Sequence, residues 1–376
     1  MAVIGVVGLG VMGLGIAQVF AGAGNRVIVT DAVDAARAAA LSRLRDVCAL
    51  RVAAGRMDPA AMASLLRNVK LTPEVAGLAD CDMVVEAIVE SIDAKRALFA
   101  QVQAVAPGAV LATNTSSLSV QAIAQGLTDP SRMLGLHFFN PAPVMKLVEL
   151  VDAGTDAGAL TLARDLTEGA GKVVVTCADR PGFIVNRCAR PFYGEALALL
   201  EEGRGAAEID AAVMSAGYRL GPFALIDLIG ADINLAATES LFAAMEGHPR
   251  YHVFQALRDQ VARGHLGRKT GRGFVTGTDA AQATPPPDAA EIVLRIEAAL
   301  VNEAASLLDE GTVTLQAIDT ALRLGLNFPR GAFAAARVHG YARIAAALAR
   351  CGVQAPPNLR ERYDEVGGLK AALSGS

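Results

Sequence analysis

The sequence has few cysteines and no excess of basic residues, and both shortages exclude classes of protein. Its five cysteines are scattered, odd in number and form no CxxC pair, so neither a disulfide framework nor a zinc site is expected. With 34 Lys and Arg against 38 Asp and Glu, the formal net charge is -4, and no polybasic stretch could bind phosphates or a membrane surface. We therefore expect reduced thiols in a cytoplasmic protein with no metal, no nucleic-acid partner and no membrane partner.

Charged residues are also missing from the start of the chain, between Ala2 and Gly24. Such a stretch superficially resembles a signal peptide or a membrane span. Seven glycines interrupt it, no basic residue precedes it and no obvious cleavage site follows it. Glycine at this density does not favour a lipid-spanning helix, so the segment fits a nucleotide-binding unit better than a membrane anchor.

Apolar residues are abundant. Of the 376 residues, 53% are hydrophobic and 19% are charged, which is enough apolar surface for a large core. The length is two to three times that of an ordinary domain. We therefore expect two or three folded domains.

A nucleotide-binding pattern begins the chain. Residues 3–7 are expected to form a buried strand, residues 14–23 a helix and residues 26–30 a second buried strand. The sequence GLGVMG lies between the first strand and the helix. Its first glycine permits the tight turn, the second lets the backbone approach a pyrophosphate and the third allows close packing of helix on strand. The expected loop contacts of the cofactor are Gly8, Gly10, Met12 and Gly13.

Asp31 stands at the end of the second predicted strand, directly after Thr30. A carboxylate at this place binds the hydroxyls of the adenosine ribose and repels the 2′-phosphate of NADP. A strand before the glycine loop, a helix after it and this acid together are far more specific than the loop alone. The sequence therefore predicts NAD as the cofactor.

Further buried strands are expected at residues 83–86, 110–113 and 133–138, with helices such as residues 93–106 between them. Alternating strands and helices are typical of a doubly wound parallel sheet of the Rossmann type, in which ligands bind beyond the carboxyl ends of the strands. Polar residues follow these strand ends, namely Glu90 and Lys95, then residues 114–117, then residues 137–141.

His137 is the expected proton acceptor, and Glu149 lies a short distance after it in the chain. A carboxylate beside a histidine fixes its tautomer and stabilises the imidazolium. In isolation, His137 would more often be a core histidine bonded to a backbone carbonyl. Because it accompanies the nucleotide motif and a serine-rich strand end, we expect a catalytic role.

Longer motifs extend the pattern: VVEAIVESIDAKRALF, NTSSLSV, GLHFFNPAPVMKLVELV, RPGFIVNR, GPFALIDLIG and KTGRGF. With GLGVMGLGIA, they resemble the L-3-hydroxyacyl-CoA dehydrogenases, including the 3-hydroxybutyryl-CoA dehydrogenases, over roughly residues 3–275. HFFNPxPVMKLVE together with the serine motif is specific for this family, whereas the glycine loop alone is not.

The resemblance implies NAD-dependent oxidation of an L-3-hydroxyacyl-CoA to a 3-oxoacyl-CoA, a step of fatty-acid metabolism and β-oxidation. It makes His137 the general base, Glu149 its partner, Ser116 the holder of the substrate oxygen and Asn186 a contact of the acyl group or the oxygen charge. The positions that match the family's NAD site are Asp31, Glu90, Lys95, Asn140 and Lys269.

Simpler roles stay open for some of these residues. Glu90 and Lys95 could be a surface ion pair, and Lys269 a solvated turn residue. The serine and lysine usually associated with coenzyme A in this family do not align clearly. Arg51 and Arg56 are the candidate replacements, although an ordinary charged helix face explains either arginine equally well.

An internal repeat follows residue 180, where long alanine- and leucine-rich helices begin. GEA and LLEEG near Glu195 match NEA and LLDEG near Glu303, at an offset of 108 that drifts to 110 further along. The expected domains are an NAD-binding Rossmann domain at 1–180, a helical domain at 181–276, a proline-containing linker at 277–290 and a second helical domain at 291–376.

Asn186 falls on Leu294 in the second helical domain, which is therefore expected to be structural and to pack on the first as an intrachain pseudo-dimer. Further homo-oligomerisation is left open. The expected function is that of an NAD-dependent 3-hydroxyacyl-CoA dehydrogenase. The alternatives are a dehydrogenase of a free hydroxy or sugar acid such as L-gulonate, and a non-catalytic, crystallin-like NAD-binding protein.

Overall fold

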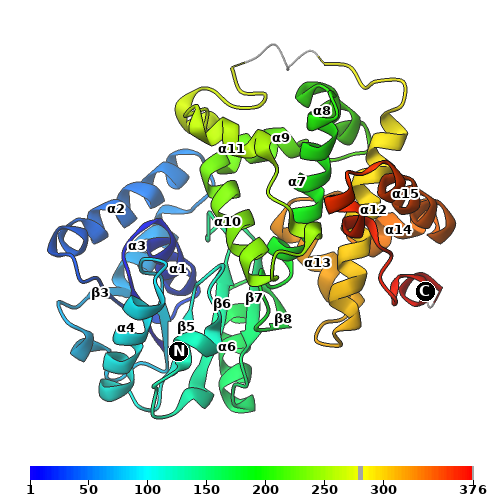
Figure 1. Ribbon diagram of the computed structural model, residues 1–376. Coiled ribbons are helices and arrows are strands. Elements are labelled where there is room, and N and C mark those ends of the chain that lie inside the picture. Colours follow the sequence, from blue (N-terminus) through cyan, green and yellow to red (C-terminus); the bar gives the residue numbers. More distant parts are fainter. Residues whose placement is uncertain (278–282, 375–376) are drawn as a thin grey trace. The chain divides into compact units, whose positions relative to one another are not determined.

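A computed structural model describes residues 1–277 and 283–374. The chain divides into two compact units, Met1–Phe183 and Ile184–Ser376 (Figure 1). The division falls three residues after the position expected from the sequence. Residues 278–282 of the expected linker lie outside the described residues, and the next helix begins at Ala289, within the last residues assigned to the linker.

The first unit is built on one sheet of eight strands in the order β3-β2-β1-β4-β5-β6-β7-β8. All five strands expected from the sequence occur at the expected residues, and the Rossmann-type fold is confirmed. The strands are β1 (Val3–Val7), β2 (Arg26–Thr30), β3 (Val69–Leu71), β4 (Met83–Glu86), β5 (Val110–Thr113), β6 (Met133–Phe138), β7 (Leu147–Asp152) and β8 (Val173–Ala178).

The sheet departs from a fully parallel arrangement at one edge. Strands β1 to β6 are parallel to their neighbours, whereas β7 runs antiparallel to β6 and parallel to β8. Only residues 139–146 connect β6 to β7, which is too short for the crossover that a parallel pair requires. This reversal sets His137 directly opposite Glu149 in the β6–β7 register.

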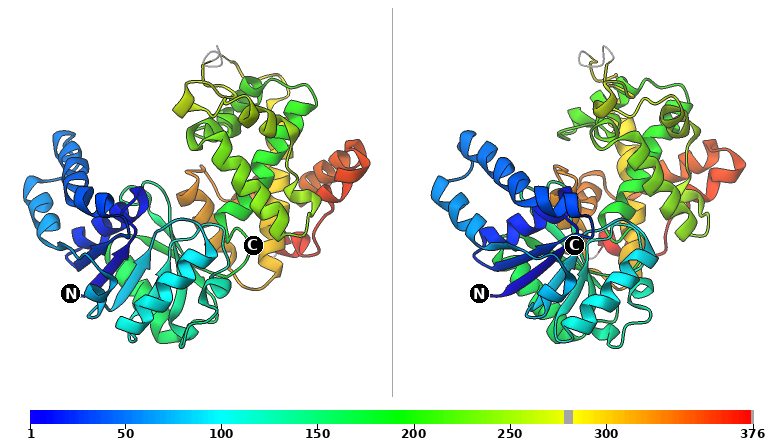
Figure 2. Two further views of the ribbon diagram at one scale, coloured as in Figure 1. Left: turned by 60° about the vertical axis from the view of Figure 1, so that its left-hand side comes forward. Right: turned by 90° about the vertical axis from the view of Figure 1, so that its left-hand side faces the viewer.

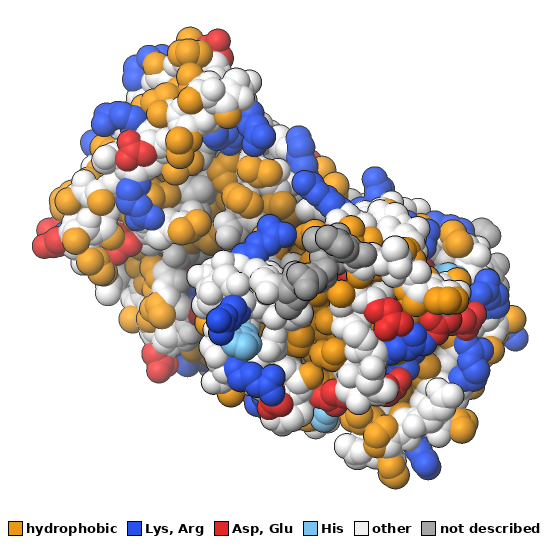
Figure 3. Space-filling view, turned by 90° about the horizontal axis from the view of Figure 1, so that it is seen from above, with side chains coloured by type: hydrophobic (Ala, Val, Ile, Leu, Met, Phe, Trp, Pro, Cys, Tyr) orange, Lys and Arg blue, Asp and Glu red, His pale blue; other side chains and the backbone are white. Residues whose placement is uncertain are grey.

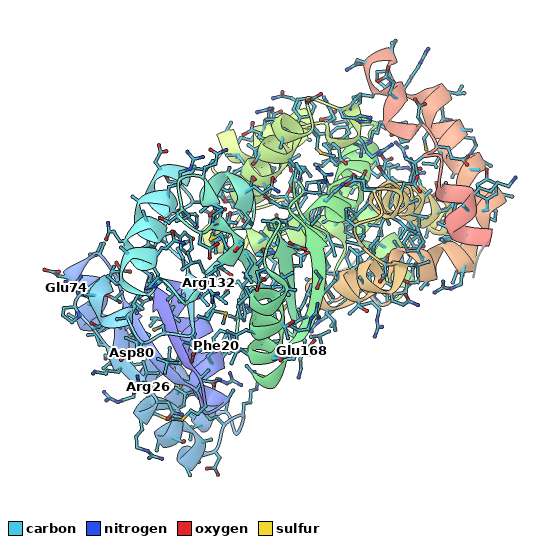
Figure 4. All side chains as sticks on the ribbon, turned by 90° about the horizontal axis from the view of Figure 1, so that it is seen from below. Phe20, Arg26, Glu74, Asp80, Arg132 and Glu168 are labelled. Atoms are coloured by element: carbon cyan, nitrogen blue, oxygen red, sulfur yellow. The ribbon has the colours of Figure 1, made fainter. Side chains whose placement is uncertain are left out.

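Helices cover both faces of the sheet, as expected of a doubly wound fold (Figure 2). Helices α1 and α6 pack against one face of the sheet and form a single apolar core with it. Helices α4 and α5 pack with each other. Phe20 of α1 is fully buried in that core, whereas Arg26 and Glu168 are exposed (Figure 4). The helices of this unit are α1 (Val11–Gly22), α2 (Asp34–Ala53), α3 (Pro59–Arg67), η1 (Val75–Leu78), α4 (Ile92–Val105), α5 (Val120–Ala124), η2 (Pro130–Arg132) and α6 (Ala157–Gly169).

The second unit is helical, and its elements recur in the same order. Helices α9 and α10 begin at Pro222 and Ala231, and their counterparts α14 and α15 begin at Ala332 and Tyr341. The elements are α7 (Val185–Glu201), α8 (Ala206–Ser215), α9 (Pro222–Ile229), α10 (Ala231–Ala244), η3 (Pro249–Tyr251), α11 (Gln255–Ala262), η4 (Arg268–Thr270), α12 (Ala289–Asp309), α13 (Leu315–Gly325), α14 (Ala332–His339), α15 (Tyr341–Gln354), η6 (Pro357–Tyr363) and α16 (Leu369–Ser374).

One local contact occurs in both halves of this unit. Asp210 accepts hydrogen bonds from the N–H groups of Phe223 and Ala224 at the start of α9. Asp319 accepts the same bonds from the two residues after Ala332 at the start of α14. A carboxylate satisfies N–H groups that a helix cannot pair internally, so the repeated Ile-Asp and Gly-x-Phe elements of the sequence serve one structural purpose.

Helices α7 and α12 pack together and exchange equivalent ion pairs. Arg187 of α7 donates to Glu303 of α12 at 2.6 Å, and Arg295 of α12 donates to Glu195 of α7 at 2.9 Å. The same offset that relates the sequence motifs of the repeat relates one pair to the other. This reciprocity extends to the 3₁₀ turns: Arg250 and Tyr251 bond Glu303, and Arg362 and Tyr363 bond Glu195.

Candidate active site

The glycine loop lies between β1 and α1, and two of its positions accept only glycine. Gly8 has a positive φ of 96°, and a Cβ at Gly13 would lie 1.7 Å from the carbonyl oxygen of Gly8. A Cβ at Gly10 would meet nothing within 4 Å, so the backbone there faces open space. No side chain of the described residues caps the N-terminus of α1, where Met12 lies. These N–H groups and this open space fit the pyrophosphate of a dinucleotide.

Asp31 is held at the end of β2 by two backbone N–H groups. Its carboxylate accepts from Leu9 at 2.7 Å and from Val33 at 2.9 Å. It borders a cavity of about 1170 Å³ that is also lined by Gly8 and Gly10. The cavity lies at the switch point between β1 and β4, where doubly wound sheets bind nucleotides, and this position fits a ribose of NAD.

Glu90 and Lys95 are not a surface pair, because the Lys95 side chain is only 1% exposed. Its ammonium lies 2.6 Å from Glu86 and 3.2 Å from Glu90. Glu86 is fully buried at the end of β4, where it also accepts a bond of 2.7 Å from the Thr113 hydroxyl. The sequence analysis missed Glu86, although an acidic residue that ends a buried strand was a signal that could have identified it.

Glu90 organises the turn that carries Ser116. One of its carboxylate oxygens accepts from the Thr115 hydroxyl at 2.6 Å, the Ser116 N–H at 3.1 Å and the Ser117 hydroxyl at 3.0 Å. Burial alone would raise the pKa of Glu90, but the bond from Thr115 and the charge of Lys95 lower it below its ordinary value. The charged carboxylate therefore fixes the turn after β5.

His137 and Glu149 form a buried hydrogen-bonded pair on adjacent strands. The His137 Nδ1 and a Glu149 carboxylate oxygen are 2.7 Å apart, and Glu149 is fully buried. An ionised carboxylate only accepts, so it selects the tautomer in which Nδ1 carries the proton and Nε2 keeps a lone pair. Phe139 and Phe183 lie beside the imidazole, with ring centroids at 4.5 and 5.8 Å, and they shield it from water.

Asn140 is exposed at the start of the loop between β6 and β7, and the peptide bond to Pro141 is cis. Lys172 holds this loop by donating to the carbonyl oxygens of Ala142 and Met145, the latter at 2.8 Å. The structure thus places Asn140 just after His137, beyond the carboxyl end of β6.

Asn186 and Lys269 belong to the second unit. Asn186 lies in the first turn of α7, and its carbonyl oxygen accepts from Arg190. Lys269 lies in η4 and pairs with Asp232 at 2.7 Å. Asp227, a residue that the sequence analysis missed, accepts from three N–H groups of residues 274–276 and so fixes the KTGRGF segment.

The two arginines considered for coenzyme A lie in different surroundings. Arg51, in the last turn of α2, lines a cavity of about 300 Å³ together with Lys146 and Lys172. Arg56 is exposed in the loop after α2 and does not line that cavity. Burial, and then the charges of Lys146 and Arg51, lower the pKa of Lys172 to about 8, so these cations repel one another and an anion between them would relieve the repulsion.

Several other features bear on the expected function. All five cysteines are buried, and none of them forms a disulfide bond within the described structure. In the described part of the chain, no three His, Cys, Asp or Glu side chains are grouped so that they could hold a metal ion, and no helix has the length and apolar character needed to cross a membrane. On the face shown in Figure 3, basic side chains are scattered among acidic and apolar ones.

Comparisons with known proteins identify the family of the chain. Residues 3–180 match the NAD-binding domain of 3-hydroxyacyl-CoA dehydrogenase, and residues 182–277 and 292–366 both match its C-terminal domain. The 3-hydroxyadipyl-CoA dehydrogenase of Escherichia coli is 33% identical over 96% of this chain and 94% of its own length. The 3-hydroxybutyryl-CoA dehydrogenase of Mycobacterium tuberculosis is 38% identical over 73% of this chain and 97% of its own length.

A crystal structure of 3-hydroxybutyryl-CoA dehydrogenase from Escherichia coli has the same fold. It aligns with a TM-score of 0.91 and 32% identity over 99% of this chain and 98% of that one. The fold and the site define an NAD-dependent oxidoreductase. The chain belongs to the 3-hydroxyacyl-CoA dehydrogenase family and carries that family's C-terminal domain twice. These relatives do not favour the free hydroxy acid or crystallin-like alternatives.

Proposed function

We propose that this enzyme oxidises L-3-hydroxyacyl-CoA to 3-oxoacyl-CoA with His137 as the general base. The observation that carries the proposal is the 2.7 Å bond between His137 and the buried Glu149, because it leaves Nε2 free to accept the proton of the C3 hydroxyl. Glu149 stabilises the imidazolium that results. In the reverse direction, the imidazolium returns this proton to the C3 oxygen.

Ser116 and Asn186 act on the substrate. The Ser116 hydroxyl, on the turn fixed by Glu90, would bond the C3 oxygen, and Asn186 would bond the acyl group or the same oxygen as its charge changes. Bound NAD supplies the hydride acceptor; the residues proposed to hold it are the glycine loop with Met12, Asp31, Glu90, Lys95, Asn140 and Lys269.

The reaction is tested by NADH formation with a panel of L-3-hydroxyacyl-CoA esters and the corresponding free hydroxy acids. We expect turnover of the thioesters and little or none of the free acids, L-gulonate included. Turnover of free acids with comparable kcat/KM, or no turnover of any thioester, would overturn the proposal.

We further propose that Arg51, with Lys146 and Lys172, binds a phosphate of coenzyme A. The support is the basic cavity that these three residues line. A charge-assisted hydrogen bond contributes about 1.5–3 kcal/mol. The Arg51→Ala variant should therefore show a KM for the acyl-CoA raised about 10-fold or more, with kcat little changed.

Arg56→Ala is the matched control, since it removes a nearby arginine that does not line the cavity. Steady-state kinetics of the two variants should differ in KM for the thioester. If both substitutions raised KM equally, Arg51 would attract the substrate only through long-range charge and would not bind its phosphate.

We also propose a division of labour between the domains. The first unit would bind NAD, helices α7 to α11 would contribute Asn186, and helices α12 to α16 would serve as their structural partner, since Leu294 replaces Asn186 there. The reciprocal pairs Arg187–Glu303 and Arg295–Glu195 support an intrachain pseudo-dimer, because a two-fold interface uses the same contacts twice. We propose a cytoplasmic location, where thiols such as these buried ones stay reduced.

A further inference from the structure

Arg190 is buried on α7, and none of the residues that the structure describes gives it an acidic partner. Its guanidinium donates to the carbonyl oxygens of Asn186 at 3.2 Å and Asn234 at 3.2 Å and to the Thr238 hydroxyl at 2.9 Å, and it lies 5.0 Å from the ring centroid of Tyr193. These groups are all neutral. Burial lowers the pKa of Arg190, and Tyr193 only opposes the change. The positive charge is therefore not neutralised within the described structure.

The other buried arginines of the described chain differ from Arg190 in having acidic partners. Arg187, Arg250 and Arg362 all bond a buried glutamate. Buried charges are normally paired in this way, because an unpaired ion is costly to remove from water. Pairing of α7 with α12 does not require Arg190, since the equivalent position in the second repeat is the buried Ala298.

A second observation lies on the neighbouring helix α10. Asn234 is 2% exposed, and neither its side-chain nitrogen nor its side-chain oxygen has a hydrogen-bond partner in the described structure. The Tyr193 hydroxyl is buried and equally without a partner. Unpaired buried polar groups destabilise a protein and call for an explanation. Tyr193 and Asn234 both contact Arg190, through the tyrosine ring and the asparagine backbone oxygen. A bound anion would neutralise the guanidinium and could accept hydrogen bonds from the Asn234 amide nitrogen and the Tyr193 hydroxyl.

From these contacts we infer that Arg190 and Asn234 bind the terminal carboxylate of a dicarboxylic 3-hydroxyacyl-CoA. The inference rests on the proposed function, in which Asn186 contacts the reacting end of the substrate. None of these bonds of Arg190 uses its Nη2, so this nitrogen and the Asn234 amide are the donors for the carboxylate.

The spacing suits a six-carbon diacid. Arg190 lies one helical turn after Asn186, which is a rise of about 6 Å along a helix, and its side chain reaches back far enough to bond the Asn186 carbonyl oxygen. In a six-carbon diacid, three C–C bonds of about 1.5 Å each separate C3 from the terminal carboxyl carbon. A carboxylate three bonds from C3 therefore lies within reach of Arg190 when Asn186 contacts the C3 end.

The experiment compares 3-hydroxyadipyl-CoA with 3-hydroxyhexanoyl-CoA, which have the same number of carbons and differ in the terminal carboxylate or methyl group. For the wild-type enzyme, kcat/KM for NADH formation should be about 10–100-fold higher with the diacid. In the Arg190→Met variant, the ratio of the two kcat/KM values should fall to about one or below. A purely structural role would lower both values together and leave the ratio unchanged.

The Asn234→Asp variant gives an independent test with almost no change in shape. Its carboxylate would pair with Arg190 and repel the carboxylate of the substrate, so the diacid preference should again be lost. If Arg190→Met does not fold, the wild-type ratio and this variant decide. A wild-type ratio of one or below, or an unchanged ratio in Asn234→Asp, overturns the inference while turnover of the monoacid upholds the proposed function. Absence of NADH with both thioesters contradicts the proposed function itself.

Discussion

The His137→Gln variant should fold and bind NAD with unchanged affinity, but its kcat should fall by about 10²–10⁴-fold, the range typical of a lost general base. Glutamine can still bond Glu149, yet it cannot accept the proton of the C3 hydroxyl. The glycine loop and Asp31 are untouched, so the nucleotide site should be preserved. Steady-state NADH formation gives kcat, and a fluorescence titration with NADH gives the dinucleotide affinity.

Ser116→Ala provides the comparison for this variant. It removes one hydrogen bond to the substrate oxygen but leaves the proton acceptor in place, so its loss of kcat should be smaller. A His137→Gln enzyme with nearly wild-type kcat would show that another group takes the proton.

Removal of helices α12 to α16, by ending the chain at Gly277, should convert the protein into a homodimer or an aggregate. The truncation uncovers the face of α7 that carries Arg187 and Glu195, both buried in the full chain. Because the two repeats exchange equivalent contacts, two truncated copies can reproduce them, with Arg187 of one copy bonding Glu195 of the other. Sedimentation velocity of the full and truncated chains measures this change.

The Arg187→Glu substitution in the truncated chain is the control. It places like charges opposite each other at the new interface, so it should abolish the dimer. A truncated chain that stays monomeric, soluble and as stable as the full chain would show that α12 to α16 do not cover α7.

Features encoded by short stretches of sequence could be predicted, and those that depend on distant contacts could not. The five predicted strands, the glycine loop and Asp31 follow from local patterns of apolar residues and turns. The sequence could not show that Lys95 is buried and also pairs with Glu86, so Glu90 and Lys95 could not be distinguished from a surface ion pair. Strands β3, β7 and β8, which the sequence analysis did not predict, and the reversal at β7 depend on pairing with neighbouring strands.

In the helical half, the role of a charged residue depends on whether it is buried and on which residue it pairs with. In the sequence, Arg187 and Arg190 are two arginines less than one helical turn apart. Their difference appears only when Glu303, a residue far away in the chain, is placed beside one of them. The repeat could be recognised from matching motifs, but the reciprocal ion pairs it creates require the folded unit.

The covalent joining of two equivalent helical repeats has a consequence for how substitutions act. In a two-fold homodimer, every change in the gene alters both sides of the interface, so a substitution useful for binding must also be tolerated at the symmetric position. In this chain each half is encoded separately. Leu294 and Ala298 can therefore serve packing in α12 while Asn186 and Arg190 serve another purpose in α7, and specificity can change on one side without altering the other.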